Sequence, residues 1–283
     1  MTTISPVFES DLILDEYIAE THFRGFSVGY EDSEYRYDAL VELIFSALTD
    51  FSLTEKEKSN INPFNAQRKL KKAAKVIYAT EKYSRRGEFG EILLHIIMRD
   101  YFNSIPAISK MYYKDGANET VKGFDAVHVV PIGKELELWL GEVKFYNNMA
   151  KAIRDVLPEL QAHTNKDYLR SEFLFISNKV DDTWEHAENF LKLIDGRISM
   201  DKIFSKIRIP VLLTYDSKVV NSYRDACEDY KKELINELHK HHDTFRGNDL
   251  PKNVEIILIL LPIEQKAKLV QNLHDKLRIW QQI

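Results

Sequence analysis

The chain has 283 residues and a mass of 33.1 kDa, which fits one large domain or one domain with an appendage. Hydrophobic residues make up 44% and charged residues 29%, and the formal net charge is −5, so the composition is globular and excludes disorder and low-complexity repeats. The single cysteine, Cys227, excludes an intramolecular disulfide and a cysteine-built metal site. Neither a membrane-spanning run nor a signal-peptide pattern is present, so we expect a soluble protein of a reducing compartment.

Charge is distributed unevenly along the chain. Residues 1–50 hold eleven acidic residues against Arg24 and Arg36, whereas residues 65–86 hold eight basic residues against Glu81. A basic run of this kind is either a solvated helix face or a patch that faces phosphate. The acidic head could cover that patch or dock a partner. The candidate DNA-binding residues are Lys69, Lys72, Arg85, Arg86 and, further along, Lys151.

The first part of the chain is predicted to be helical. Apolar spacing predicts helices over residues 37–53, 64–80 and 88–102, and Thr54 to Glu57 has the form of a capping box. We therefore expect residues 1–83 to form a helical N-terminal section, with partner docking as its predicted role, and residues 84–283 to form the main domain.

The middle of the chain is richer in strands. The predicted strands cover residues 109–114, 121–131, 136–146, 209–215 and 254–261, with a further apolar run at 173–177. The predicted helices cover residues 148–164, 183–194, 217–241 and 264–282. This order of elements favours an α/β fold, with a mixed β-sheet flanked by helices.

Three charged side chains interrupt the apolar faces of two neighbouring strands. Alternation places Glu142 and Lys144 on the face that also carries Leu140, and it places Asp125 on a face with Val127. Buried charges need pairing or a metal, so these positions call for an explanation. Asp125 lies eight residues before the Gly133-Lys134 turn and Glu142 lies eight after it, so a hairpin would place them opposite each other.

The predicted helix 88–102 has one narrow polar stripe. It consists of Glu88, Glu91, His95 and Arg99, while most of the other positions are apolar. The stripe is either the exposed edge of a buried helix or a polar face directed at Asp125 and Glu142.

These residue types suit metal-dependent phosphodiester hydrolysis. A divalent cation held by two or three carboxylates neutralises charge on the phosphorane and lowers the pKa of a bound water. Oxygen ligands point to Mg²⁺ or Mn²⁺ and not to zinc. A lysine two residues beyond a ligand can orient the attacking water and stabilise negative charge.

At these residues the sequence resembles the PD-(D/E)xK nuclease superfamily, in which an Asp is followed by Glu-x-Lys on a β-hairpin. It departs from the signature at Phe124, which stands where the pattern has Pro. Three segments are more specifically similar to HamA, the nuclease subunit of Hachiman antiphage defence systems: residues 86–91 (RGEFGE), 123–128 (GFDAVH) and 139–144 (WLGEVK).

The resemblance implies a restriction-endonuclease-like core and a role for each matching residue. Asp125 and Glu142 would coordinate the metal together with the backbone carbonyl of Val143, and Lys144 would position water. Glu91 would be the carboxylate that the helix contributes to the metal site, and Glu88 is the alternative for this role.

The resemblance also implies DNA as substrate, a bacterial cytoplasmic location, and a partner helicase, HamB, that restrains the nuclease. Two alternatives stay open: a non-catalytic DNA-binding or regulatory subunit that retains the fold, and a nuclease that cleaves RNA. The complete Asp, Glu and Lys set favours catalysis.

The remaining histidines are predicted to be structural. His239, His241 and His242 are interpreted as a solvated helix end and not as a metal cluster. His128 falls on the face opposite Asp125 and is interpreted either as structural or as a support for the site residues, and His163 is expected near a helix end.

Overall fold

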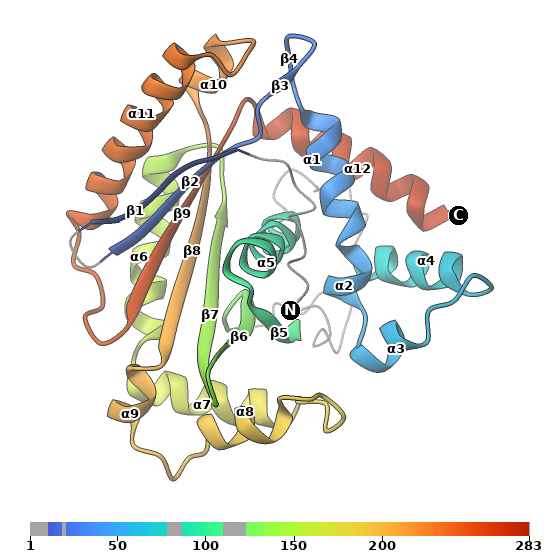
Figure 1. Cartoon of the computed structure of the whole chain (residues 1–283), viewed down its shortest axis with the longest axis vertical. Helices are drawn as coiled ribbons and strands as arrows, with labels where there is room; N and C mark the ends of the chain where they lie inside the picture. Colours follow the sequence, from blue (N-terminus) through green and yellow to red (C-terminus); the bar gives the residue numbers. More distant parts are fainter. Residues whose placement is uncertain (1–10, 19–20, 78–86, 110–122, 283) are drawn as a thin grey trace.

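A seven-stranded mixed sheet runs through the part of the chain that the computed structural model describes, namely residues 11–18, 21–77, 87–109 and 123–282. The strand order is β1-β2-β9-β8-β7-β6-β5, and helices cover both faces (Figure 1). The predicted α/β fold with a mixed sheet is therefore confirmed.

The strands divide into a parallel centre and two antiparallel edges. β7 (Glu135–Phe145), β8 (Ile207–Asp216), β9 (Glu255–Ile263) and β2 (Thr21–Ser27) are mutually parallel neighbours. β5 (Ile105–Ser109) and β6 (Ala126–Ile132) pair antiparallel beside β7, and β1 (Asp11–Ile18) pairs antiparallel with β2. A separate two-stranded ribbon joins β3 (Tyr30–Glu31) to β4 (Glu34–Tyr35).

Two helical layers enclose the sheet (Figure 1). One layer holds α1 (Tyr37–Ser46), α2 (Leu48–Ser52), α3 (Glu55–Ser59), α4 (Ala66–Val76), α5 (Glu88–Phe102) and α12 (Lys266–Gln282). The other face is covered by α6 (Met149–His163) and α11 (Glu228–Arg246). The shorter connecting helices are α7 (Lys166–Ser177), α8 (Ala187–Leu193), α9 (Met200–Phe204) and α10 (Lys218–Ser222).

Several predicted elements agree closely with the structure. α5 begins and ends at the predicted residues, and Asn103 ends it in the left-handed conformation that commonly follows a helix. Thr54 and Glu57 form the predicted capping box at the start of α3. The predicted helix 37–53 is interrupted at Ala47, and the predicted helix 217–241 is divided into α10 and α11.

The acidic N-terminal section departs from the prediction. Residues 11–18 and 21–27 are strands of the main sheet and not part of a helical section, because β2 pairs in parallel with β9, from His22 beside Ile257 to Gly25 beside Leu260. The apolar run 173–177 lies within α7. Of the predicted strand 109–114 only Ser109 lies in β5, and residues 110–122 lie outside the described residues. The boundary between residues 83 and 84 also lies outside them and stays a prediction.

Candidate active site

The predicted pairing of Asp125 with Glu142 is present at the open end of the β6–β7 hairpin. The last paired residues are Ala126 and Gly141, so Asp125 and Glu142 come next in register. The Asp125 N–H donates to the Gly141 carbonyl at 2.8 Å, and Asp125 Oδ2 accepts a hydrogen bond from the Val143 N–H at 2.9 Å. Beyond the end of β6, the Asp125 carboxylate thus accepts the hydrogen bond from β7 that a backbone carbonyl of a neighbouring strand would otherwise accept.

The orientation of Val143 follows from that hydrogen bond. In a β-strand the N–H and C=O of one residue point to the same side. Since the Val143 N–H is directed at Asp125, its carbonyl oxygen points to the same side. The Val143 carbonyl oxygen is therefore directed to the side where a cation bound to Asp125 would lie.

Glu142 is a buried carboxyl with a histidine partner. Only 1% of the residue is exposed, and its Oε1 contacts Nδ1 of His163 on α6. Burial raises the pKa of Glu142 to about 7, with a further contribution from the charge of Asp125, while His163 and Lys144 act in the opposite direction. Burial lowers the pKa of His163, but its bond to Glu142 outweighs this and the net shift is upward.

Lys144 is held by a second residue of α6. Its Nζ forms an ion pair with Glu159 Oε2. Burial lowers the pKa of Lys144, but Glu159, and then Glu142 and Asp125, raise it above the ordinary value for lysine. The side chain therefore carries its positive charge at neutral pH.

The loop before Asp125 explains the Gly-Phe pair of the motif. Gly123 has φ +125°, a backbone conformation that residues with a Cβ rarely adopt, so this position favours glycine. Phe124 is buried with its ring edge toward His163, at 5.1 Å between centroids. His163 also stacks on Tyr168 at 4.5 Å. These rings fix the imidazole that contacts Glu142.

α5 packs on the face of β7 opposite Glu142 and Lys144. A Cβ on Gly90 would lie 2.7 Å from Phe145 Cβ, and one on Gly141 would lie 2.7 Å from Leu94 Cδ2, so helix and strand approach closely. Glu88 and Glu91 are half-buried in the first turn of α5, and their predicted role at the site stays a prediction.

The second half of the polar stripe on α5 is directed elsewhere. His95 Nε2 lies 2.8 Å from Asp50 Oδ2, and Arg99 Nη1 donates to the same oxygen at 3.0 Å. His95 Nδ1 also contacts His128 Nε2 at 3.2 Å, and His128 Nδ1 contacts the Ser104 hydroxyl at 2.8 Å. The hypothesis that the whole stripe faces the carboxylates is therefore wrong for His95 and Arg99. His128 is structural, as predicted.

The donor set suits a hard divalent cation. No group of three or more His, Cys, Asp or Glu side chains is arranged for a metal among the described residues. Two carboxylates, Asp125 and Glu142, and the Val143 carbonyl remain, all of them oxygen donors. Mg²⁺ is commonly held by one or two carboxylates while it keeps several waters and binds substrate phosphates, so the set fits Mg²⁺ or Mn²⁺.

The predicted DNA-binding residues lie apart in the fold. Lys69 and Lys72 on α4 both form ion pairs with Glu57. Lys151 on α6 lies over the Tyr146 ring at 4.9 Å. Arg85 and Arg86 lie outside the described residues.

The histidine trio of α11 is not a solvated helix end. His242 is fully buried and stacks on Phe23 at 4.8 Å, and the helix continues to Arg246. The interpretation of this residue as a solvated terminus is wrong because this side of α11 packs on β2.

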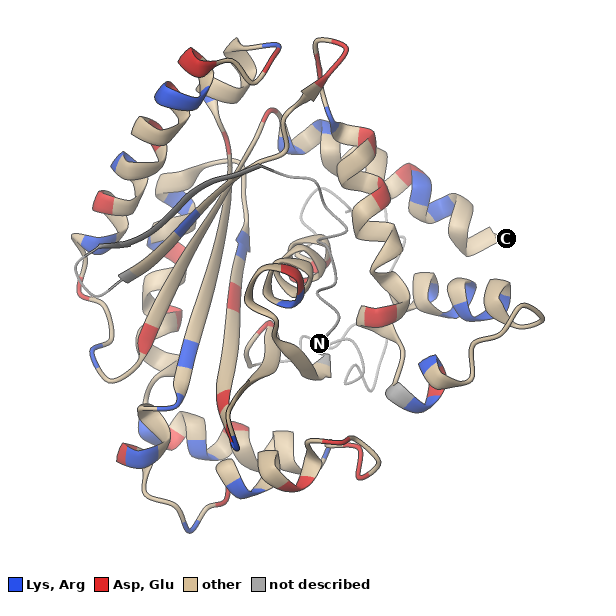
Figure 2. Ribbon diagram, viewed as in Figure 1, with Lys and Arg blue, Asp and Glu red and all other residues tan. Residues whose placement is uncertain are grey.

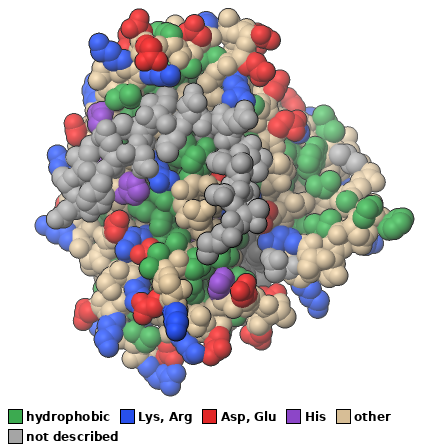
Figure 3. Space-filling view, in the orientation of Figure 1, with side chains coloured by type: hydrophobic (Ala, Val, Ile, Leu, Met, Phe, Trp, Pro, Cys, Tyr) green, Lys and Arg blue, Asp and Glu red, His purple; other side chains and the backbone are tan. Residues whose placement is uncertain are grey.

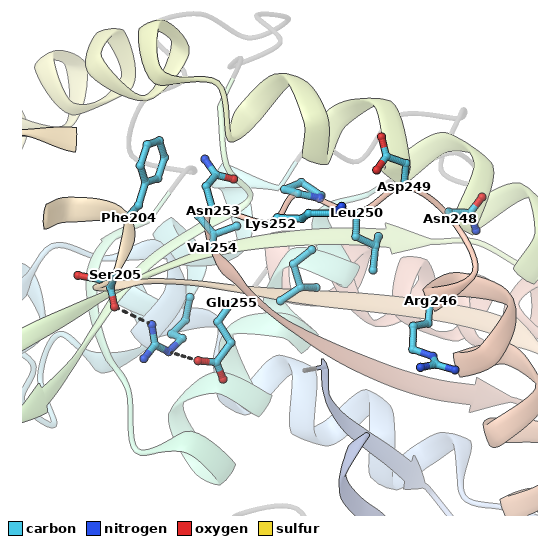
Figure 4. A pocket seen from close by; sticks show the side chains of 13 residues that line it. Phe204, Ser205, Arg246, Asn248, Asp249, Leu250, Lys252, Asn253, Val254 and Glu255 are labelled. Atoms are coloured by element: carbon cyan, nitrogen blue, oxygen red, sulfur yellow. Dashed lines mark hydrogen bonds and ion pairs between the residues drawn. The ribbon is translucent and has the colours of Figure 1, made fainter. Parts of the chain in front are cut away.

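A surface hollow of about 770 Å³ lies at the other end of the parallel strands, where β8 and β9 begin. Arg208 in its wall donates to the Ser205 carbonyl and pairs with Glu255, as the dashed lines in Figure 4 show. The hollow is therefore separate from Glu142 and Lys144, which lie toward the end of β7.

Two residues of the site, Glu159 and His163, were not identified from the sequence. His163 continues the apolar stripe of α6 formed by Ala152, Val156 and Leu160, where a polar side chain needs a buried partner. This polar residue in an apolar stripe was the feature of the sequence that could have indicated His163 as a site residue. It does not reveal the partner, because Glu142 becomes a neighbour only when α6 packs on β7.

The fold and the site together define an α/β protein whose central hairpin holds an Asp, a buried Glu and a Lys at one end. A family model described as HamA matches residues 3–277, and the chain belongs to the HamA family, whose members are Hachiman-associated defence-system subunits. A search of curated proteins finds no match. Within the described residues, no helix has the length and apolar character needed to cross a bilayer.

Proposed function

We propose that the chain is a metal-dependent DNA nuclease and the effector subunit of a Hachiman-type antiphage complex. The observation that carries the proposal is the convergence of Asp125, Glu142 and Lys144 at one end of the β6–β7 hairpin. The preceding helix α5, the three antiparallel strands, the following helix α6 and the parallel strand β8 are the order expected of a PD-(D/E)xK core.

Each residue has a role in the proposed reaction. Asp125, Glu142 and the Val143 carbonyl would hold Mg²⁺ or Mn²⁺, which when bound supplies charge neutralisation and a more acidic water. The protonated Lys144 orients the attacking water and stabilises the charge that develops on the phosphate. Glu91, with Glu88 as the reserve, is the proposed helical carboxylate.

His163 and Glu159 are positioning residues in this proposal. His163 holds the carboxyl of Glu142, and Glu159 holds the ammonium of Lys144. Both come from α6, which follows β7 directly, so the strand and its covering helix fix the two reactive side chains together.

We further propose that a partner helicase restrains the nuclease and delivers DNA to it. Membership of the HamA family, which implies a defence-system subunit, supports a multi-component complex. The acidic N-terminal segment, residues 1–50, is the proposed docking region, and the basic helix α4 is left for contact with DNA.

The experiment is a cleavage assay with linear and circular duplex DNA and Mg²⁺, with and without the helicase partner and its nucleotide. Glu142→Gln and Lys144→Met are compared with wild type, and Glu135→Gln, an exposed residue of the same strand, is the matched control. We expect metal-dependent cleavage by wild type and the control, and none by the two site variants. DNA binding without cleavage in every metal and partner condition would support a regulatory subunit, and cleavage of RNA alone would change the substrate.

A further inference from the structure

The loop between α3 and α4 is built to hold one aromatic side chain outward. Asn62 Oδ1 accepts the Phe64 N–H at 3.0 Å, and Asn65 Oδ1 accepts the Asn62 N–H at 2.9 Å. Asn65 Nδ2 donates to the Asn60 carbonyl at 2.8 Å, and Asn60 Nδ2 donates to Lys56 O at 2.7 Å. Three asparagines thus satisfy the turn internally and fix its conformation.

The residue that this loop presents is Phe64, whose side chain is fully exposed. Ile61 in the same loop is also exposed, and Figure 3 shows hydrophobic side chains at the outer tip of this part of the molecule, at the right of the view. A large apolar side chain left in water buries no area in the core, so folding alone does not account for an ordered loop that holds Phe64 outward. Its position is instead typical of a binding contact.

The helix that follows Phe64 carries cations on its outer side. Residues 55–77 hold seven basic residues and two acidic ones, and α4 itself contains no acidic residue (Figure 2). Arg68, Lys72 and Lys75 are exposed at i, i+4 and i+7 spacing, so they share one helix face, and Phe64 lies four residues before Arg68. The buried residues Ala73 and Ala74 lie on the side that packs against α2 and α12.

Only part of this positive charge is neutralised. Glu57 pairs with Lys69 and Lys72, whereas neither Arg68 nor Lys75 has an ion pair within the described residues. From Arg68 to Lys75 the helix rises about 10 Å, a length that spans about three phosphates of one strand.

We propose that Phe64 and the outer face of α4 bind single-stranded DNA, with a base stacked on the Phe64 ring and phosphates on Arg68 and Lys75. The inference rests on the proposed function, that the chain acts on DNA. An aromatic side chain beside a row of cations is the arrangement by which proteins bind unpaired strands without sequence preference. In duplex DNA the base faces are stacked on one another and a ring reaches them only by unstacking a base step, so the surface favours unpaired nucleotides.

The test measures binding of the full chain, alone and in complex with its helicase partner, to a short labelled oligothymidylate and to a duplex. EDTA is present, so binding is scored independently of cleavage. Phe64→Ala is compared with Phe64→Trp and with Ile279→Ala, which removes an exposed apolar side chain from α12. We expect Phe64→Ala to weaken single-strand binding about five- to 150-fold, with little effect on the duplex. Phe64→Trp and Ile279→Ala retain wild-type affinity.

Two further readouts identify stacking and phosphate contact. The added tryptophan fluorescence of Phe64→Trp is quenched as the oligonucleotide saturates the protein. Arg68→Gln with Lys75→Gln lowers the slope of log affinity against log salt by about 1.4, about 0.7 for each lost phosphate contact. All variants retain the wild-type melting temperature, because Phe64, Arg68, Lys75 and Ile279 are all exposed.

Unchanged single-strand affinity in Phe64→Ala overturns the inference, and so does a wild-type protein that binds no single strand. Loss of association with the helicase in Phe64→Ala, with DNA binding intact, also overturns it and makes the loop a protein-docking site. If single-strand binding requires Phe64 but the protein cleaves no DNA, only the proposed nuclease activity is refuted. If the protein cleaves DNA but Phe64→Ala does not change single-strand binding, only this inference is refuted.

Discussion

At the scale of single residues, the contact between Glu142 and His163 decides whether the buried carboxyl is tolerated. The side chains are 2% and 15% exposed, so neither can rely on water to solvate its charge. Removing one partner of a buried pair leaves the other unpaired, which is more costly than removing both.

His163→Ala is therefore expected to lower the free energy of unfolding by about 3 kcal/mol. In a Glu142→Gln background the same substitution is expected to cost about 1 kcal/mol or less, because no buried charge is then left unpaired. Urea denaturation of the four proteins at one pH measures both values. Equal losses in the two backgrounds would show that the pair has no coupling and that His163 acts through packing alone.

At the scale of elements, the close approach of α5 to β7 is set by Gly90 and Gly141. Alanine normally favours a helix over glycine, yet a methyl group at Gly90 would meet Phe145 Cβ at 2.7 Å and Val143 Cγ2 at 3.1 Å. The crowded atoms belong to a central strand and have little freedom to move.

Gly90→Ala is expected to destabilise the protein by about 1–3 kcal/mol through overpacking. Gly87→Ala is the matched control in the same helix start, because no atom lies within 4 Å of a Cβ there, and it should cost about 1 kcal/mol or less, since alanine is a poorer N-cap than glycine. Thermal melts of both variants compare them directly. Similar melting temperatures would mean that α5 can shift away from the sheet at no cost.

The sequence predicted correctly those helices that have a clear apolar pattern and a capping or terminating residue of their own. α5 has a continuous apolar pattern ended by Asn103, and α6 follows Asn148, whose side chain caps the helix by accepting a hydrogen bond from the Lys151 N–H. β2 was missed because its parallel partner β9 lies more than two hundred residues away in the chain. α7 contains the strand-like run 173–177, but its own cap, Asn165, was the stronger signal.

For the site, the symmetric spacing of Asp125 and Glu142 about the hairpin turn was sufficient to pair them. The contacts of Glu159 and His163 depend on how α6 crosses β7, which no local pattern specifies. Asp50 was missed for the same reason, since it meets His95 only when α2 packs on α5.

At the scale of the whole molecule, buried histidines link stability to pH. Burial lowers the pKa of His128 well below its usual value, and burial also lowers the pKa of His242, whose Nδ1 lies 3.6 Å from Asp243 Oδ1. An unfolded histidine has a pKa of about 6.5, so below that pH the unfolded chain binds protons that the folded chain does not. The free energy of unfolding therefore has its full value above pH 6.5, where both histidines are neutral in the folded and the unfolded chain. It decreases as the pH falls below 6.5.

Each such histidine contributes a slope of up to about 1.4 kcal/mol per pH unit below pH 6.5. His242→Met removes one titrating group from the contact with Phe23, so the decline in unfolding free energy between pH 6.5 and 5 should become shallower, by no more than that amount per pH unit. Urea denaturation across this range, with pH 8 as the reference for packing effects, measures it. A slope identical to that of wild type would mean that His242 is protonated equally in both states.

The proposed metal site is tested most directly by iron-mediated cleavage of the polypeptide. Fe²⁺ bound in place of Mg²⁺ generates, with ascorbate and peroxide, hydroxyl radicals that cut the nearby backbone. We predict cuts close to Asp125 and Glu142 that excess Mg²⁺ suppresses and that Asp125→Asn and Glu142→Gln abolish. Cuts confined to other parts of the chain, or cuts at these two positions that persist in Glu142→Gln, would contradict the assignment of this hairpin as the metal-binding active site.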